Sequence, residues 1–345
     1  VLTFEIAGAI LLFFRYYLAH GYELGKAVWF SVFHAVSAFC NAGISLHPNN
    51  LLDMRGDAAY MIIIALLVAA GGIGFLVLSN VFRYRFWRRD LRRRGHIILQ
   101  ARIVLWMSLI LSIGGGILFS ALEWNGSLVH DPSAPGLWAS LMDGAWRDAL
   151  IALGTDFEEA CAGIAQTVFF RTAGFNAIPM GEVSHPANVF SVLLMLIGGA
   201  PGSMAGGIKT TTLVVVLLTI RAYIRGNPDV QLHRRTIPDS ICREAMVILF
   251  FYLTTLFLLY FILLFTEHTL IAKHGEFALF YEASSALGTV GVTLDATGDL
   301  SQIGRLLISL AMFLGRIGPV SLALMMASRA QAPHVRYPEE TVSVG

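Results

Sequence analysis

Long apolar stretches alternate with shorter ones along this chain. Stretches of about 20 residues, enough to cross a bilayer, are predicted at roughly 1–18, 58–82, 99–123, 188–222, 243–266 and 302–328. Shorter apolar pieces lie near 27–39, 158–170 and 277–287, and their length suits re-entrant pore helices. The order of span, short helix and span occurs three times. This pattern predicts an all-α membrane protein made of repeated span–pore helix–filter loop–span units around a central pore.

Each predicted pore helix is followed by a loop in which glycine stands behind small or polar residues. The loops read Cys40-Asn41-Ala42-Gly43, Arg171-Thr172-Ala173-Gly174 and Gly288-Thr289-Val290-Gly291. The third contains Thr-Val-Gly, the core of the potassium-channel filter, in which backbone carbonyls replace the ion's hydration shell. Glycine has no β-carbon, so an ion can approach its backbone closely. The loops therefore predict an ion-binding selectivity filter formed by these residues, with glycine used only for tight helix packing as the alternative.

The chain also repeats itself in sequence. Residues 35–46 align with residues 283–294, and five of the twelve positions are identical. The loop glycines are separated by 131 residues (43 to 174) and 117 residues (174 to 291). A period near this length fits one span–loop–span unit and a linker, so the repeat supports one pore assembled from similar units.

A glycine-rich segment interrupts the fourth long apolar stretch. It contains five glycines and one proline before a lysine: Gly198, Gly199, Pro201, Gly202, Gly206, Gly207 and Lys209. Such a composition opposes a regular helix, and irregular backbone at membrane depth must line a cavity or be covered by protein. We interpret the segment as a flexible gate below the filter.

Two enzyme interpretations of the same segment are weaker. A phosphate-binding Walker A loop needs adjacent glycine and lysine, but Ile208 stands between Gly207 and Lys209. An intramembrane serine hydrolase would use Ser203, which lacks the GxSxG pattern around it. We therefore expect a protein without covalent catalysis, and keep the hydrolase as a minor alternative.

Ionisable residues within apolar stretches are functional candidates because their burial in a membrane is costly. Arg316 lies in the last predicted span, and Lys209 ends the glycine-rich segment. Arg171 stands directly before the second filter loop, and Glu282 lies in the last pore helix. A cation pore disfavours an arginine at its axis, so we expect Arg171 to turn away and pair with a carboxylate such as Glu282.

Composition and charge support a membrane protein and exclude other classes. Hydrophobic residues make up 56% of the chain and charged residues 14%, against about 25% charged in soluble domains. The net charge of +1 offers no basic surface for nucleic acid. The three cysteines lie far apart without a CxxC pair, which argues against a disulfide framework or a zinc site.

The distribution of arginine predicts the orientation in the membrane. Seven arginines fall within 83–96 (Arg83, Arg85, Arg88, Arg89, Arg92, Arg93 and Arg94), and more follow in the next linker and in the tail. Each of these segments follows the second span of a unit. By the positive-inside rule they are cytoplasmic, and the filter loops open outward. The run 83–96 serves topology alone or additionally docks a cytoplasmic partner.

Together these motifs resemble the Trk/Ktr/HKT superfamily of potassium transporters, in particular bacterial pore-forming subunits of the TrkH/KtrB kind. The resemblance covers nearly the whole chain and implies potassium uptake across the bacterial inner membrane, with Na⁺ or H⁺ coupling left open. It implies a glycine-rich intramembrane gate, with Arg316 near it. It also implies a homodimer in membrane lipid, bound to a cytoplasmic nucleotide-binding regulatory subunit of the TrkA/KtrA kind, with K⁺ as transported substrate, no covalent cofactor and no nucleic acid.

The resemblance further implies four pore units, of which this chain shows the second to the fourth. The expected parts are the second repeat (1–82), an arginine-rich cytoplasmic linker (83–98), the third repeat with the gate (99–225), a second linker (226–242), the fourth repeat (243–329) and a cytoplasmic tail (330–345). We expect a further unit with its own filter ahead of Val1. A sodium-selective or non-selective transporter of the same superfamily, and a purely structural fragment, are the alternatives.

Overall fold

The fold was obtained as a computed structural model, which describes residues 1–85, 97–123 and 160–318. These residues are mainly helical, and the strands among them are β1 (Val230–Leu232) and β2 (Arg235–Ile237), an antiparallel hairpin in which Leu232 pairs with Arg235. The α-helices are α1 (Leu2–Phe14), α2 (Leu24–Phe39), α3 (Ala58–Ile73), α4 (Phe75–Arg85), α5 (Leu99–Leu109), α6 (Gly115–Glu123), the helix Ala160–Phe169, α9 (His185–Leu196), α10 (Thr210–Ile224), α11 (Asp239–Thr266), α12 (His268–His274), α13 (Glu276–Gly288) and α14 (Gln302–Ile317). Short π- or 3₁₀-helical turns are Arg15–Ala19, Leu52–Met54, Ile110–Gly114, Met180–Glu182 and Thr297–Asp299.

Among the described residues, three continuous helices are long and apolar enough to cross a membrane. They are Leu2–Ala19, Leu99–Glu123 and Asp239–Thr266. The first joins α1 to a π-helical turn, and the second joins α5 and α6 through another. They lie where spans were predicted at 1–18, 99–123 and 243–266, because uninterrupted apolar runs of this length have few other stable conformations.

Three short helices of the described chain lie where pore helices were predicted. They are the apolar helices α2 and Ala160–Phe169 and helix α13. Small side chains near their ends, such as Ala38 in α2 and Ser285 in α13, are buried. Small residues let neighbouring backbones approach closely, so the C-terminal ends of these helices pack inside the protein, while α2 keeps an exposed apolar face that includes Trp29 and Val32.

The predicted span at 58–82 is not one straight helix. The helices α3 and α4 meet at an angle of 96°. The break is at Gly74, whose φ of +85° is strained for any residue with a β-carbon. Because the run stays apolar through this glycine, hydropathy alone predicted a continuous span.

The predicted span at 188–222 is also divided, as its glycine-rich segment suggested. Helices α9 and α10 are separated by residues 197–209. The hairpin β1–β2 and the short helix α12 were not predicted. Residues 319–328 of the last predicted span, the tail at 330–345 and most of the arginine-rich linker lie outside the described residues.

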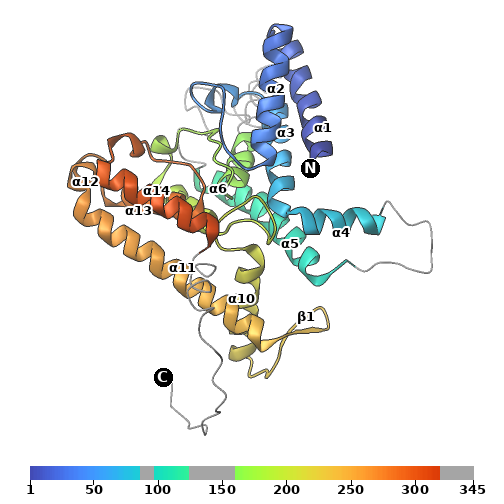
Figure 1. Cartoon of the computed structure of the whole chain (residues 1–345), viewed down its shortest axis with the longest axis vertical. Helices are drawn as coiled ribbons and strands as arrows, with labels where there is room; N and C mark the ends of the chain where they lie inside the picture. Colours follow the sequence, from blue (N-terminus) through green and yellow to red (C-terminus); the bar gives the residue numbers. More distant parts are fainter. Residues whose placement is uncertain (86–96, 124–159, 319–345) are drawn as a thin grey trace, which may run out of the picture.

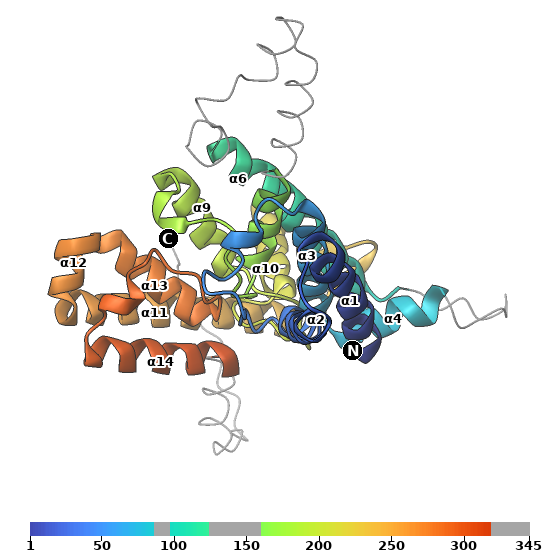
Figure 2. The ribbon, with the colours of Figure 1, turned by 90° about the horizontal axis from the view of Figure 1, so that it is seen from above.

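Two helix groups flank the centre of the molecule. Helices α1, α2 and α3 pack together on one side, and α11, α13 and α14 pack on the other (Figures 1 and 2). The first group is held by a buried core that includes Leu12 and Ile64, and the second by one that includes Leu256 and Leu287. Figure 2 shows α10 between the two groups, with α6 and α9 along one side of them.

Candidate ion filter and gate

The three predicted filter loops meet at one place. A β-carbon built on Gly174 would lie 2.9 Å from the Cα of Gly43, 3.2 Å from Val290 O and 3.4 Å from Ala42 O. A β-carbon on Gly43 would lie 2.5 Å from Ala173 O and would overlap Gly174. The carbonyls that precede the three glycines therefore gather where the loops touch, an arrangement that concentrates oxygen atoms suited to a dehydrated cation.

The loops share one unusual backbone conformation. The glycine and the residue two positions before it have positive φ in each loop: Asn41 (50°) and Gly43 (67°), Thr172 (70°) and Gly174 (79°), Thr289 (54°) and Gly291 (87°). Positive φ is an outlier for a β-branched residue and costs about 1–3 kcal/mol. Threonine adopts it at the same position of two loops, which indicates a shape imposed by the surrounding protein.

Helix ends add a favourable electrostatic field. The helices α2, Ala160–Phe169 and α13 all end as they enter the filter loops. A helix C-terminus carries a partial negative charge, which stabilises a cation nearby. The two aligned loops leave their helices in the same way, because Ala42 N–H donates to Ser37 O at 2.9 Å and Val290 N–H donates to Ser285 O at 2.8 Å.

The segment 197–209 forms a loop that is closed at its base. Gly198 N–H donates to Ile208 O at 2.9 Å, and Ile208 N–H donates to Leu196 O at 3.1 Å. Thr210 N–H donates to Gly199 O at 3.1 Å as α10 begins. Compact loops of this size whose ends lie close together are frequently functional. We call residues 197–209 the intramembrane loop.

The intramembrane loop rests on the broken end of α3. Ala200 N–H donates to Gly72 O at 2.9 Å, and Phe75 N–H donates to Gly202 O at 3.4 Å. These bonds satisfy backbone groups that a helix end leaves free. They explain structurally why α3 and α4 part at Gly74.

The same loop touches the third filter loop. A β-carbon on Gly206 would overlap the side chain of Thr289. The predicted gate and the predicted filter are therefore in direct contact, and only a glycine fits between them.

The basic residues named from the sequence take different positions. Lys209 Nζ donates to Ala205 O at 2.6 Å, within the intramembrane loop. Arg316 lies in the last turn of α14, and its charge interacts with Lys209 and with Cys40. Arg316 thus stands beside the loop at a helix end, although the sequence suggested the middle of a span.

Arg171 turns into the protein but does not pair as expected. Its side chain is buried, and Nη2 donates to Ser108 Oγ of α5 at 3.5 Å. Within the described ranges no carboxylate forms an ion pair with Arg171. The expected partner Glu282 instead accepts hydrogen bonds from Thr293 and Thr297.

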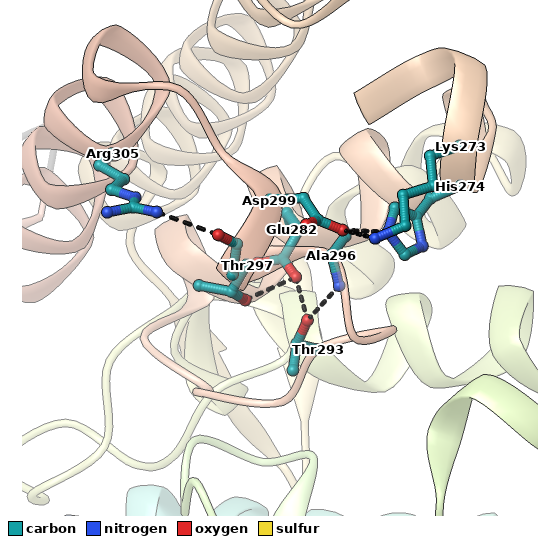
Figure 3. Close-up of polar contacts among 9 residues, drawn as sticks. Lys273, His274, Glu282, Thr293, Ala296, Thr297, Asp299 and Arg305 are labelled. Carbon is teal, nitrogen blue, oxygen red and sulfur yellow. Dashed lines mark hydrogen bonds and ion pairs between the residues drawn. The ribbon is translucent and has the colours of Figure 1, made fainter. Parts of the chain in front are cut away.

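This threonine network was missed in the sequence. Figure 3 shows Glu282 directed at the two hydroxyls, while Asp299 on the same segment pairs with Lys273 at 2.6 Å and His274 at 2.7 Å. Threonine is common in loops and carries little signal by itself. The sequence did offer one signal for it. In the internal alignment His34 and Glu282 occupy the same position of two pore helices, and both are polar.

Comparisons with known proteins agree with this geometry. The family TrkH, described as "Cation transport protein", matches residues 1–335. The potassium/sodium uptake protein NtpJ of Enterococcus hirae is 33% identical over 99% of this chain and 69% of its own length. The Ktr system potassium uptake protein B of Bacillus subtilis is 33% identical over 100% of this chain and 69% of its own.

A solved structure shows the same fold. The potassium transporter TrkH from Vibrio parahaemolyticus superposes with a TM-score of 0.67 at 15% identity, over 94% of this chain and 62% of that chain. This likeness concerns the fold, while the family match covers nearly the whole sequence. The chain belongs to the TrkH family of cation transport proteins.

Proposed function

We propose that the protein takes up K⁺ through a filter formed by residues 40–43, 171–174 and 288–291. One observation carries this proposal: three loops with positive φ at the same two positions meet with their carbonyls together. Carbonyl oxygens held in this way replace water around a cation. Membership of a transport family also removes the hydrolase alternative, and Ser203 Oγ accepts a local hydrogen bond from Ala205 N–H at 3.3 Å.

The intramembrane loop acts as the gate in this proposal. Its glycines, Gly198, Gly199, Gly202, Gly206 and Gly207, allow the chain to fold tightly between α3 and the third filter loop. Lys209 and Arg316 place positive charge beside it. A loop with these contacts obstructs the ion path when docked and opens it when released.

Sodium is the second candidate substrate. The relative from Enterococcus hirae is named a potassium/sodium uptake protein, and the two relatives share the same identity to this chain. Any test of the proposal therefore measures both ions in parallel.

The cellular setting completes the proposal. We place the protein in the bacterial inner membrane as a homodimer in contact with lipid, with coupling to Na⁺ or H⁺ as a further possibility. Exposed phenylalanines on α11, such as Phe250 and Phe257, support contact with lipid. The name of the Bacillus subtilis relative places it in a "Ktr system", which supports a cytoplasmic nucleotide-binding regulatory subunit as partner here.

Uptake measurements test the function directly. The full chain, produced in a bacterium that lacks its own potassium uptake, should restore growth at low K⁺ and accumulate K⁺ in preference to Na⁺. Gly291→Asp should abolish that preference while the protein still inserts, because a side chain and a charge would enter the filter. Gly298→Ala is the control, since no atom lies within 4 Å of its added β-carbon. Unchanged K⁺ preference in Gly291→Asp would refute the filter assignment.

A further inference from the structure

Each pore helix carries a buried polar side chain, eight or nine residues before its filter glycine, that bonds to the chain beyond that glycine. In α2 the Ser37 hydroxyl also bonds beyond the glycine, to the backbone of Ile44. His34 Nε2 accepts the N–H of Leu46 at 3.3 Å in the first unit. In the second, Gln166 Oε1 accepts the N–H of Ala177 at 2.8 Å. In the third, Glu282 Oε1 accepts the hydroxyls of Thr293 and Thr297, the latter at 2.8 Å. We call these three side chains, His34, Gln166 and Glu282, the anchors.

The anchors occupy equivalent places. They precede the filter glycine by 9 residues (34 to 43), 8 residues (166 to 174) and 9 residues (282 to 291). The groups they bond follow the glycine by 2 and 3 residues in the first unit (Ser45, whose Oγ lies 3.1 Å from His34 Nε2, and Leu46), by 3 in the second (Ala177) and by 2 and 6 in the third (Thr293 and Thr297). Three different residue types make the same connection, which indicates that the connection itself is required.

The anchors are all protected from water. His34 and Gln166 are 0% exposed and Glu282 is 4% exposed. His34 Nδ1–H donates to Phe30 O at 2.8 Å, which leaves Nε2 free to accept. A buried acceptor that loses its donor costs free energy, so these bonds hold the chain segments firmly.

Glu282 is the strongest of the three cases, because its carboxylate is buried and accepts two hydrogen bonds there. Among residues whose structure is described, no basic side chain forms an ion pair with it. Nearby charges come from Asp295 and His274. The two threonine hydroxyls are therefore its main hydrogen-bond partners, and Thr293 Oγ1 in turn accepts Ala296 N–H at 3.3 Å (Figure 3).

The third filter loop is thus fixed on both sides of its glycine. Before it, Ser285 O accepts Val290 N–H at 2.8 Å, and Ser285 Oγ accepts Gly291 N–H at 3.2 Å. After it, Glu282 holds Thr293. The Val290 carbonyl belongs to the same peptide plane as the Gly291 N–H, which Ser285 holds, and Glu282 fixes the chain as it leaves that plane two residues later.

We propose that Glu282 is a positioning residue for the third filter loop, and that it sets ion discrimination by holding the Val290 carbonyl in place. His34 and Gln166 do the same for the first and second loops. The inference rests on the proposed function, because the filter must conduct cations for the anchors to affect selectivity. When an anchor is lost, the loop relaxes, and its carbonyls adapt to a smaller ion such as Na⁺.

Two kinds of variant test this in the full chain, with K⁺ and Na⁺ uptake measured together. Glu282→Leu removes the acceptor, and Thr293→Val with Thr297→Val removes the donors while keeping their shapes. We expect either change to lower the K⁺/Na⁺ uptake ratio about tenfold, the effect of losing about 1.4 kcal/mol. Glu282→Gln keeps an acceptor oxygen and should retain most of the ratio. Asp299→Asn is the control for a nearby carboxylate that does not touch the filter segment.

The outcomes separate this inference from the proposed function. If the unmodified chain moves neither ion, the proposed function fails. If the unmodified chain prefers K⁺ and both Glu282→Leu and the double valine variant keep that preference, the anchor role is wrong. If Glu282→Leu does not accumulate in the membrane, the double valine variant alone decides. An equal fall of the K⁺/Na⁺ uptake ratio in Glu282→Gln and Glu282→Leu would also overturn the inference. The ratio would then depend on the charge of Glu282 and not on its hydrogen-bond acceptor.

Discussion

Asn50 and Asn176 join the first and second filter loops. The Oδ1 of Asn50 accepts the N–H of Asn176 at 3.3 Å, and the Asn176 carbonyl accepts Leu51 N–H at 3.0 Å. The Asn50 amide also donates to Gly174 O at 3.4 Å. Asn50 and Gly174 lie 124 residues apart in sequence, so these bonds lock the chain after the first filter loop to the second loop, next to its filter glycine.

Replacing Asn50 should therefore disturb both loops at once. Asn50→Leu removes both side-chain bonds, and we expect the K⁺/Na⁺ uptake ratio to fall about two- to tenfold, the range for one or two net hydrogen bonds. Asn50→Asp can still accept the Asn176 N–H but cannot donate to Gly174 O, so its K⁺/Na⁺ uptake ratio should fall less than that of Asn50→Leu. The Asn49 side chain donates to Asp53 on the surface, so Asn49→Leu controls for a leucine in this turn, and Asn50→Asp controls for the positive φ of Asn50 (58°). Equal ratios in Asn50→Leu and Asn49→Leu would contradict the bracing role.

Alanine at the filter glycines should have graded effects. At Gly43 a β-carbon would overlap Gly174, whereas at Gly291 the nearest atom, Gly174 Cα, would lie 3.3 Å away. Both positions have positive φ, which costs alanine about 1 kcal/mol or more. Gly43→Ala should abolish K⁺ uptake, and Gly291→Ala should keep part of it with lower K⁺/Na⁺ discrimination. K⁺ uptake is compared at equal protein levels in the membrane. If Gly291→Ala loses more uptake than Gly43→Ala, the space around the glycines does not control the filter.

The fold class followed from the lengths of the apolar runs, but its irregular points were harder to predict. Leu2–Ala19 and Leu99–Glu123 are long apolar helices without proline, and their glycines, such as Gly114, are accommodated with a π-helical turn in each helix. The intramembrane loop was visible as five glycines and a proline. The bend at Gly74 was not, because Gly71, Gly72 and Gly74 lie in a run that stays apolar, and hydropathy does not distinguish a glycine that packs within a helix from one that ends it.

The details of the candidate site depended on tertiary contacts that local patterns do not report. Thr172 and Thr289 adopt positive φ although β-branched residues avoid it, so their conformation comes from the protein around them. The expected pairing of Arg171 with Glu282 rested on opposite charge alone. The structure instead uses threonine hydroxyls for Glu282 and a serine for Arg171, and such weakly polar partners leave no distinctive pattern in a sequence.

The ionisable side chains of Asp57, Arg15 and His20 form a cluster outside the filter, and this cluster should make the stability of the protein depend on pH. Asp57 caps α3 by accepting Tyr60 N–H at 2.9 Å, and it pairs with Arg15 at 2.7 Å and His20 at 2.9 Å. Burial alone would raise the pKa of Asp57, but the bonds from Tyr60, Arg15 and His20 hold that pKa below its ordinary value. The resulting stabilisation is fully present above about pH 3.9, the ordinary pKa, and is lost as pH falls through the lower pKa of the folded state.

Thermal unfolding of the purified protein in detergent checks this. Asp57→Asn should lower the melting temperature near neutral pH and weaken its decline below about pH 4, the ordinary range of aspartate. Asp57→Ala should be less stable still, by about 1 kcal/mol, because it also loses the helix cap. An Asp57→Asn protein whose melting temperature follows pH as the unmodified protein does would rule out this source of acid sensitivity.

The final prediction concerns the intramembrane loop. Lys209 Nζ donates to Ala205 O at 2.6 Å and so ties the end of the loop to its tip. Lys209→Met removes this bond and a positive charge from the ion path but leaves the filter contacts intact. We expect K⁺ uptake to rise with an unchanged K⁺/Na⁺ ratio, and removal of residues 199–206 to raise it further. The control Lys273→Met removes an exposed lysine paired with Asp299 and should alter neither value.

If both loop variants insert normally and transport no faster, the loop is a packing element and the gate lies elsewhere. If their K⁺/Na⁺ ratio falls, the contact between Gly206 and Thr289 supports the filter, and gate and filter are one unit.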